Sequence, residues 1–542
     1  MSAPIENMQE NEFCEIEATV ASGFENVVKE DAEEKFNVPV DAKRGRIAFK
    51  VPMKDVKKVL DLGGIDNCFV VMSRFSNVNF PEDELECMAL LRKIVYNVNW
   101  KNGLDAWSKI FSFHHPIASC PETVPVDLGA PTLSSRFHQP KNPSEEKKPK
   151  LSKSERRKLR KQQAREKFAA QNVQKAKEGE NVEKTEDLET VSTTETGKND
   201  DENLNENTNN SQNVSEKAVS DSTCTVEQSA QQETLEKEQA PAPKKPKTTD
   251  QDPMKPAFRV TCNRNGQGHP FDSMGAASNF GGAVYNFFHW NVSMKQFDIE
   301  VILNIEGNEV SVCLALTRES LHRRYITAFG PTALRATHAY NMLRLCKLQP
   351  GEIICDPMCG GGSIPLQSAV SWDKCVSICG DIINNALKRT KENINYVAQT
   401  QPISLDVVRW DVTNLPLRTE SMDVCITDLP FGIRVGSKMN NWKLYPGALM
   451  EMARVTRVEK GRACLLTQDK KCINKALSVT ARYWKCRNMV GLNMGGLAAC
   501  VYVLHRTVEK YNAEDAAQML STALEHAKQK EGGSPTKTDT NQ

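Results

Sequence analysis

From about residue 330 onward, short apolar segments alternate with amphipathic helical segments, and this alternation limits the possible fold more than any other feature. The apolar segments are nearly continuous, which is typical of strands buried on both faces. Strands are expected at 352–357, 375–381, 406–412, 423–428, 461–467 and 498–506, and helices at 331–345, 363–370, 384–397 and 444–456. Because strands that alternate with helices form parallel sheets covered on both sides, the pattern predicts an α/β domain.

Four of the expected strands end in an aspartate. These residues are Asp356, Asp381, Asp411 and Asp428. Ligands of open α/β sheets bind at the carboxyl ends of the strands. The four carboxylates are therefore expected to border one binding site.

The first of these acids leads into a glycine-rich turn, "DPMCGGGSIP", ahead of a helix. Gly360, Gly361 and Gly362 allow the backbone to approach a ligand, and the N-terminus of the next helix favours a carboxylate or phosphate. The consecutive glycines do not match the G-x-G-x-x-G dinucleotide fingerprint, and no lysine follows them as it does in a P-loop. By itself, the turn is also compatible with a tight connection that binds nothing.

The second and third acids suggest which cofactor binds. Asp381 is placed to accept hydrogen bonds from ribose hydroxyls, a role that suits NAD and S-adenosylmethionine equally. Asp411 can accept from an exocyclic amine such as that of adenine. The alternative for Asp411 is an acid that caps a helix or a turn.

The fourth acid belongs to "DVCITDLPFG", in which a strand ends in an acid, a proline and an aromatic ring. Pro430 fixes its own φ angle, so the turn is stiff. On such a turn Asp428 can accept a hydrogen bond from an exocyclic amine, while Phe431 stacks on the base. A turn acid followed by a core phenylalanine is the plain alternative.

Together these motifs resemble those of the Rossmann-like, S-adenosylmethionine-dependent amino-methyltransferases, which carry Asp/Asn-Pro-Pro-Tyr/Phe at the fourth strand. Here the motif reads D-L-P-F-G, so Leu429 replaces the first proline. The resemblance implies S-adenosyl-L-methionine as cofactor. It implies catalytic roles for Asp428, Pro430 and Phe431, and cofactor contacts for Asp356, Pro357, Gly360, Gly362, Asp381, Asp411 and Thr332. Related loops often carry Thr or Ser where this chain has Gly361, so one hydroxyl contact is missing.

The rest of the chain predicts two α+β segments separated by a long polar insert. Residues 13–140 and 255–325 show alternating strands and helices. Residues 141–254 begin with a strongly basic run and continue as a polar tract almost free of aromatic residues. Such a composition buries too little apolar surface to offset its chain entropy, so the insert is expected to be disordered. The α/β domain occupies 326–510, and a helix and a disordered tail occupy 511–542.

Several longer stretches extend the resemblance to the THUMP-domain RNA methyltransferases, among them "RRYITAFGPTALRATHAYNMLRL", "FDIEVILNIEGNEVSVCLALT" and "LLTQDKKCINKALS". The chain most resembles the tRNA guanine-N2-methyltransferase family. This implies a ferredoxin-like region, a THUMP RNA-binding module and a Rossmann-like methyltransferase domain. It also implies methylation of the exocyclic N2 of guanosine at position 6 of the tRNA acceptor stem, with the THUMP module holding the 3′ end. The family also works as a heterodimer with a small zinc-binding activator subunit.

Basic residues near the motifs are candidates for contacts with RNA phosphates. They are Arg259, Arg264, Arg323, Arg324, Arg434 and Lys438, with Lys443 close to the last two. An ordinary surface charge is the alternative for each of them. Because the formal net charge is only +1, any RNA-binding surface must be local.

Two other functions are compatible with the motifs. The first is a related amino-methyltransferase that acts on adenine, cytosine or a protein amide, since this type of motif serves several planar amines. The second is a noncatalytic RNA-binding protein with a degenerate methyltransferase domain. The four intact strand-end acids argue against the second function.

The cysteine usage and the hydropathy of the sequence indicate the cellular compartment in which the protein is expected. Many of the 17 cysteines lie in apolar contexts, and their spacing does not match a common zinc site. No run of eighteen apolar residues predicts a membrane span, and the N-terminus has no features of a secretory signal. We therefore expect a reduced, cytoplasmic protein without a metal or a membrane, and the basic part of the insert is compatible with nuclear import.

Overall fold

The computed structural model describes residues 12–115, 117, 252–266, 268–432 and 436–531, without the side chains of 438 and 523–531. All of them belong to one of the two units into which the chain divides, the unit of residues 1–132 and 247–542. The expected disordered insert at 141–254 lies outside the described residues, apart from its last three positions. No helix in the described part of the chain is long and apolar enough to cross a membrane.

The two α+β segments share one eight-stranded sheet with the order β2-β3-β1-β4-β8-β7-β5-β6. Its strands are β1 (Phe13–Val20), β2 (Val40–Lys43), β3 (Arg46–Pro52), β4 (Ile65–Phe75), β5 (Ala257–Asn265), β6 (Asn291–Val292), β7 (Ile299–Glu306) and β8 (Glu309–Ala315). Antiparallel pairing of β4 with β8, from Phe69 opposite Ala315 to Phe75 opposite Val310, joins the two segments. The sequence predicts both segments but not their common sheet, because pairing between distant strands leaves no local pattern.

Helices and an aromatic cluster cover this sheet. The helices are α1 (Glu25–Phe36), α2 (Glu84–Ile94), α3 (Trp100–Ser108) and α5 (Ser273–Phe288). The 3-10 helix η3 (Met53–Asp61) lies between β3 and β4. Trp100 packs edge-on against Phe288 and Trp290. These buried rings place aromatic side chains of both sequence segments in one core.

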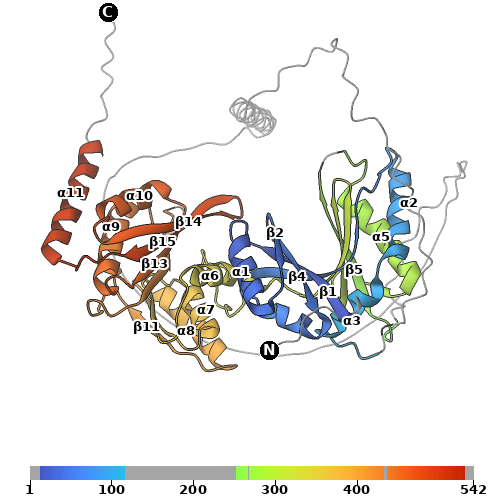
Figure 1. Cartoon of the computed structure of the whole chain (residues 1–542), viewed down its shortest axis with the longest axis horizontal. Helices are drawn as coiled ribbons and strands as arrows, with labels where there is room; N and C mark the ends of the chain where they lie inside the picture. Colours follow the sequence, from blue (N-terminus) through green and yellow to red (C-terminus); the bar gives the residue numbers. More distant parts are fainter. Residues whose placement is uncertain (1–11, 116, 118–251, 267, 433–435, 532–542) are drawn as a thin grey trace, which may run out of the picture. The chain divides into compact units, whose positions relative to one another are not determined.

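The C-terminal sheet has seven strands in the order β11-β10-β9-β12-β13-β15-β14. Figure 1 labels β11, β13, β14 and β15 of this sheet. They are β9 (Ile353–Asp356), β10 (Val376–Asp381), β11 (Leu405–Arg409), β12 (Val424–Asp428), β13 (Arg462–Thr467), β14 (Trp484–Met494) and β15 (Leu497–Arg506). The first five strands in this order are parallel, and β15 and β14 add an antiparallel edge. The expected parallel α/β sheet is confirmed, and β14 is a strand that the sequence analysis does not predict.

The helices of this domain follow the predicted pattern with shifted ends. They are α6 (Ala336–Leu345), α7 (Ser363–Ser371), α8 (Asn384–Ala398), α9 (Lys438–Val455), α10 (Lys470–Val479) and α11 (Ala513–Glu531). Helix α6 begins at Ala336 rather than at residue 331, because Arg335 is still extended, with a ψ angle of 139°. The α10 helix is an addition to the expected set.

A buried polar cluster connects α1 to α6. Asp31 is 1% exposed, and its carboxylate accepts a 2.9 Å hydrogen bond from the hydroxyl of Tyr340. Arg344 lies 3.6 Å from the other oxygen of Asp31. A buried carboxylate needs such partners, so these contacts link the N-terminal sheet specifically to the domain that carries the four strand-end acids.

Candidate active site

Three of the four strand-end acids lie along one edge of the seven-stranded sheet. Asp356 ends β9, Asp381 ends β10 and Asp428 ends β12. In the parallel register Asp356 pairs with Cys379, and Asp428 pairs with Leu466 near the end of β13. The carboxyl ends of parallel strands meet at the same edge, so the predicted grouping of these acids is present.

Asp356 and Asp428 have unusual carboxyl groups. Burial, with a smaller contribution from the nearby charge of Asp356, raises the pKa of Asp428 to about 8. Burial likewise raises the pKa of Asp356 to about 7. The Oδ1 atom of Asp428 is buried and has no hydrogen-bond partner among the described residues. An unpaired buried acceptor costs free energy, so this oxygen is suited to an N–H donor from a ligand.

The glycine turn has the backbone conformation that its sequence requires. Gly360 has a φ angle of +58° and Gly362 has a φ angle of +83°. The amide of Gly360 donates a 3.0 Å hydrogen bond to Oδ2 of Asp381, and the amide of Ile383 donates a 2.9 Å bond to Oδ1. Asp381 therefore connects the glycine turn to the start of α8.

Two side chains of α8 that the sequence analysis does not single out hold the same turn. The hydroxyl of Thr390 donates a 2.9 Å bond to the carbonyl oxygen of Gly360. The amide of Asn393 donates to the carbonyl oxygen of Gly361 at 2.9 Å and accepts from the amide nitrogens of Thr327 and Ala328 at 2.9 and 2.8 Å. Polar residues three apart on the buried face of an amphipathic helix are the signal that could have revealed them.

Helix α9 fixes the turn that follows Asp428. The carbonyl oxygen of Pro430 accepts 2.8 Å bonds from the Nδ2 atom of Asn441 and from the hydroxyl of Tyr445. The amide of Leu429 donates a 2.9 Å bond to the carbonyl oxygen of Leu466 on β13. These three hydrogen bonds, two from α9 and one to β13, fix the backbone beside the Asp428 carboxyl group.

The ring and the basic residues after this turn are described only in part. Phe431 is half-buried and packs against the main apolar core, which leaves part of its ring accessible. Arg434 lies outside the described residues, and so does the side chain of Lys438. Lys443 is exposed on α9. The role of Phe431 in stacking and of these cations in RNA binding stays a prediction.

The other predicted cofactor-binding residues are Pro357, Asp411 and Thr332, and they differ in their contacts and exposure. The carbonyl oxygen of Pro357 accepts a 3.0 Å bond from the Trp410 indole. Asp411 is an exposed turn acid, whose Oδ1 accepts 2.8 Å bonds from both the amide and the hydroxyl of Thr413. Thr332 is exposed in the turn before α6. Contacts of Asp411 with adenine and of Thr332 with the methionine end stay predictions.

The guanidinium of one predicted RNA-binding residue bonds to the backbone of the protein itself. The guanidinium of Arg324 donates to the carbonyl oxygens of Leu60 and Leu62 at 2.8 and 3.1 Å. These bonds hold η3, and burial lowers the pKa of Arg324. Arg324 therefore has a structural role, and its contact with a phosphate stays a prediction.

Three other predicted RNA-binding residues retain some exposed surface. Arg259 pairs with Glu300 at 2.8 Å and stacks on Phe297, and it is 31% exposed. Arg264 is half-buried and lies 3.4 Å from a ring nitrogen of His269. Arg323 is exposed beside the ring of Phe329. These three stay candidates for phosphate contacts.

The residues at the carboxyl edge fit S-adenosylmethionine. A methyl group added at Gly360 would meet no atom within 4 Å, so open space faces the glycine turn. The unpaired oxygen of Asp428 lies at the same edge and is available to a substrate amine. Among the described residues, no group of three His, Cys, Asp or Glu side chains is arranged to hold a metal ion.

The fold and this site define a Rossmann-like methyltransferase that uses S-adenosyl-L-methionine. A family described as RMKL-like methyltransferase domain matches residues 323–499. The tRNA (guanine(6)-N(2))-methyltransferase THUMP3 of Bos taurus is 37% identical over 523 residues, which covers 92% of this chain and 89% of the relative. Its counterpart in Homo sapiens is 37% identical over 510 residues with the same coverage. The chain belongs to this family of tRNA (guanine(6)-N2)-methyltransferases.

A solved structure shows the same fold. The crystal structure of TrmN from Thermus thermophilus matches with a TM-score of 0.55 and 17% sequence identity, covering 91% of this chain and 99% of that chain. Since the match extends over nearly all of both chains, the fold likeness includes the N-terminal sheet as well as the methyltransferase domain.

Proposed function

We propose that this protein transfers a methyl group from S-adenosylmethionine to the exocyclic N2 amine of guanosine at position 6 of the tRNA acceptor stem. The relatives that cover most of the chain carry this activity in their names. The observation that carries the chemistry is the buried, unpaired Oδ1 of Asp428 at the carboxyl edge of the sheet. It is an acceptor for one amine hydrogen of a planar base.

Positioning is the main task of the protein in this reaction. When bound, S-adenosylmethionine supplies an electrophilic methyl group. The lone pair of guanine N2 is delocalised into the ring, so the amine is a poor nucleophile. A hydrogen bond to Asp428 orients the amine, and alignment of the reacting groups supplies most of the acceleration. Asn441 and Tyr445 support this geometry by fixing the carbonyl group of Pro430.

The raised pKa of Asp428 is relevant to the fate of the proton. The amine becomes acidic as the new C–N bond forms, so no strong base is needed beforehand. A carboxyl group with a pKa of about 8 is a better proton acceptor in its ionised form than an ordinary aspartate. In its ionised form Asp428 is thus suited to orient the amine first and to accept its proton afterwards.

Recognition of the tRNA involves the base and the N-terminal sheet. A paired acceptor-stem guanine must leave its stack to reach the edge of the sheet, and Phe431 supplies a ring on which it can stack. The N-terminal eight-stranded sheet is proposed to bind the tRNA near its 3′ end. A small zinc-binding activator subunit and a cytoplasmic location complete the proposal. The activator subunit rests on the resemblance described above, and the location rests on the cysteine usage.

Substitution of Asp428 tests the chemistry. Asp428→Ala should abolish methyl incorporation into tRNA and leave tRNA binding nearly unchanged. Asp373→Ala is the matched control, because Asp373 is an exposed acid that precedes β10 at the opposite edge of the sheet. Unchanged turnover of Asp428→Ala would reject the assigned role.

Product analysis tests the substrate. Purified protein, incubated with tRNA and labelled cofactor with and without the activator subunit, should form N2-methylguanosine. A tRNA with adenosine at position 6 should not be methylated. A methylated adenosine or cytidine would reject guanine as the target base, and modification at another guanosine would reject the position.

A further inference from the structure

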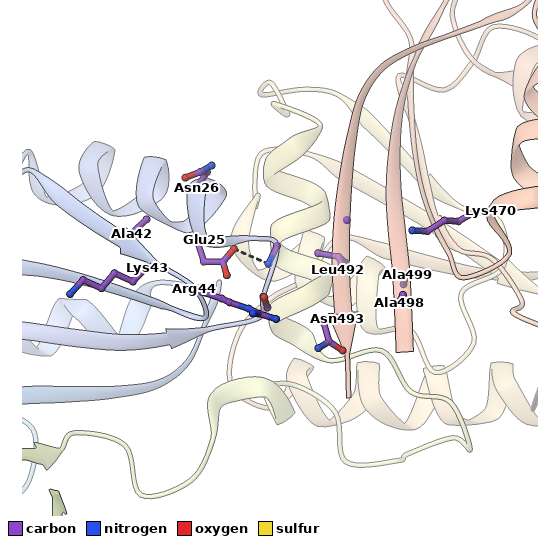
Figure 2. Close-up of a pocket in the computed structure, with 13 residues that line it drawn as sticks. Glu25, Asn26, Ala42, Lys43, Arg44, Lys470, Leu492, Asn493, Ala498 and Ala499 are labelled. Atoms are coloured by element: carbon purple, nitrogen blue, oxygen red, sulfur yellow. Dashed lines mark hydrogen bonds between the residues drawn. The ribbon is translucent and has the colours of Figure 1, made fainter. Parts of the chain in front are cut away.

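An open cavity of about 500 Å³ lies where the N-terminal sheet meets the hairpin of β14 and β15 (Figure 2). One wall comes from the turns that flank α1 and β2, and the other from β14, β15 and the first residue of α10. The lining includes three basic side chains: Lys43, Arg44 and Lys470. None of the predicted site residues lines this cavity.

Arg44 and Lys470 face the space from opposite walls. In Figure 2 the Arg44 side chain extends toward β14 and the Lys470 side chain extends toward β15 from the other side of the hairpin, whereas Lys43 points away from the hairpin. Both residues are exposed, and neither side chain forms a hydrogen bond or an ion pair with any described residue. Two cations without side-chain partners that line one cavity favour binding of an anion, and the combination of Arg and Lys suits a phosphate group.

The acid in the lining does not neutralise these cations by pairing with them. Both oxygens of Glu25 accept backbone hydrogen bonds, from the amide of Gly45 at 2.7 Å and from the amide of Gly23 at 2.8 Å. Both glycines have positive φ angles, of +75° and +111°. Glu25 therefore fixes the two turns that form one wall and leaves the cationic groups free.

The two walls are also fixed to each other. The amide of Asn493 on β14 donates a 3.2 Å bond to the carbonyl oxygen of Ser22. A methyl group at Gly23 would lie only 2.1 Å from the carbonyl oxygen of Gly491, so the two backbones are in close contact. The cations are thus presented by a preorganised frame, which reduces the entropy lost on binding.

The cavity lies along the same edge of the sheet as the catalytic acid. Asp428 pairs with Leu466, the next residue Thr467 pairs with Cys500, and Cys500 pairs with Gly491. The path from β12 to β14 therefore crosses three strand spacings, or about 15 Å. That span connects a base held at Asp428 to the sugar-phosphate backbone a few nucleotides away.

We propose that Arg44 and Lys470 bind a backbone phosphate of the substrate tRNA close to the target nucleotide. This inference rests on the proposed function, and it gives the cavity the task of setting the register of the RNA at Asp428. Phosphate contacts position a nucleic acid without reading its sequence. Removing both cations should therefore weaken the binding of all tRNA substrates to the same extent.

The test measures tRNA binding by the full chain over a series of salt concentrations. Arg44→Ala/Lys470→Ala should weaken binding by about tenfold or more at low salt and reduce the salt slope by about 1 to 2. KM for tRNA should rise while kcat and the affinity for S-adenosylmethionine are retained. Arg44→Lys/Lys470→Arg keeps both charges and should bind nearly as well as the original protein.

The matched control is Lys374→Ala/Lys460→Ala. Lys374 precedes β10 and Lys460 precedes β13, so both exposed cations lie at the opposite edge of the sheet. Equal tRNA binding and equal salt slopes for the two alanine pairs would overturn the proposal. So would an equally large loss for the charge-retaining pair, since that result would indicate packing rather than charge.

The alternative occupant of the cavity is a small phosphorylated ligand, which carries the same phosphate group as the tRNA backbone. Inorganic phosphate that binds the original protein but not the alanine pair, with tRNA binding unchanged in both, would assign the cavity to such a ligand and overturn the RNA proposal. Failure of the proposed function gives a different result. In that case no tRNA would be methylated by the original protein, whereas the alanine pair would still show weaker tRNA binding.

Discussion

Asn441 donates a 2.8 Å hydrogen bond from its Nδ2 atom to the carbonyl oxygen of Pro430. Asn441 is completely buried, so this contact is sheltered from water. The hydroxyl of Tyr445 donates a second bond to the same oxygen and lies 2.8 Å from the hydroxyl of Thr467 on β13. Helix α9 therefore determines the position of the turn that presents Asp428, although Asn441 and Tyr445 lie within a helix and not at a strand end.

Tyr445→Phe removes only the hydroxyl from this arrangement. The Pro430 carbonyl then loses one of its two donors, which should lower the free energy of unfolding by about 1–2 kcal/mol. The turn becomes less well fixed, so kcat should fall about tenfold, with the Kd for S-adenosylmethionine unchanged. Steady-state kinetics and calorimetry provide these values.

Tyr483→Phe is the control for this substitution. Tyr483 is also fully buried, but its hydroxyl accepts only a 3.4 Å bond from the amide of Asn512, away from the turn. Tyr483→Phe should therefore leave kcat near that of the original protein. If the two variants have the same kcat, the hydroxyl of Tyr445 has no positioning role.

The two glycines of positive φ in the cofactor turn should differ in their tolerance of a methyl group. At Gly362 a Cβ atom would lie 2.8 Å from Cγ2 of Thr390, whereas at Gly360 it would meet nothing within 4 Å. Both alanine variants incur about 1–2 kcal/mol of backbone strain, and only Gly362→Ala adds the overlap. Urea denaturation should therefore show a larger loss in the free energy of unfolding for Gly362→Ala than for Gly360→Ala, by about 1–3 kcal/mol. Equal losses would contradict this account of the turn.

Much of this site could be predicted from the chain because its residues follow strands. A short apolar run that ends in an acid marks a strand end in any parallel sheet, and three such acids lie at one edge as expected. Asn393 and Asn441 could not be predicted in the same way. Each lies within a helix, and its function depends on which loop the tertiary fold places opposite it.

Strand β14 and the contacts of Arg324 could not be predicted either, because both depend on the tertiary fold. Strand β14 was not predicted because Lys485, Arg487 and Asn488 interrupt its apolar pattern, and these residues are exposed on an edge strand. The basic character of Arg324 predicts a phosphate contact, but its guanidinium is used by the backbone of η3. Charge alone does not distinguish an RNA ligand from an arginine that holds the protein backbone.

Asn393→Asp should disconnect the cofactor turn from α8. The amide nitrogen of Asn393 donates to the carbonyl oxygens of Gly361 and Ala328 at 2.9 and 3.1 Å, and a carboxylate cannot donate. The substitution also buries a charge at a fully buried position. We expect a loss of about 3 kcal/mol in the free energy of unfolding and weaker binding of S-adenosylmethionine.

Asn395→Asp makes the same chemical change on the exposed face of the same helix. It should alter the free energy of unfolding by no more than about 0.5 kcal/mol. Urea denaturation and calorimetry of the pair separate a local contact from a general effect on the helix. Similar values for both variants would show that Asn393 does not hold the turn.

The raised pKa of Asp428 predicts how stability depends on pH. Burial, with a smaller contribution from the charge of Asp356, raises this pKa from its ordinary value of 3.8 to about 8. Between these two values the folded protein retains a proton that the unfolded chain has released. Stability is therefore greatest at low pH with respect to this group, and it falls as the pH rises from about 4 to about 8.

Asp428→Asn removes the group that titrates and keeps its size. The free energy of unfolding of this variant, relative to the original protein, should therefore increase with pH up to about 8 and remain constant above that value. Urea unfolding at a series of pH values measures the difference, with Asp373→Asn as an exposed control of the same charge change. A difference that does not vary between pH 5 and about 9 would mean that Asp428 titrates normally, and the proton-accepting role proposed for it would then lose its physical basis.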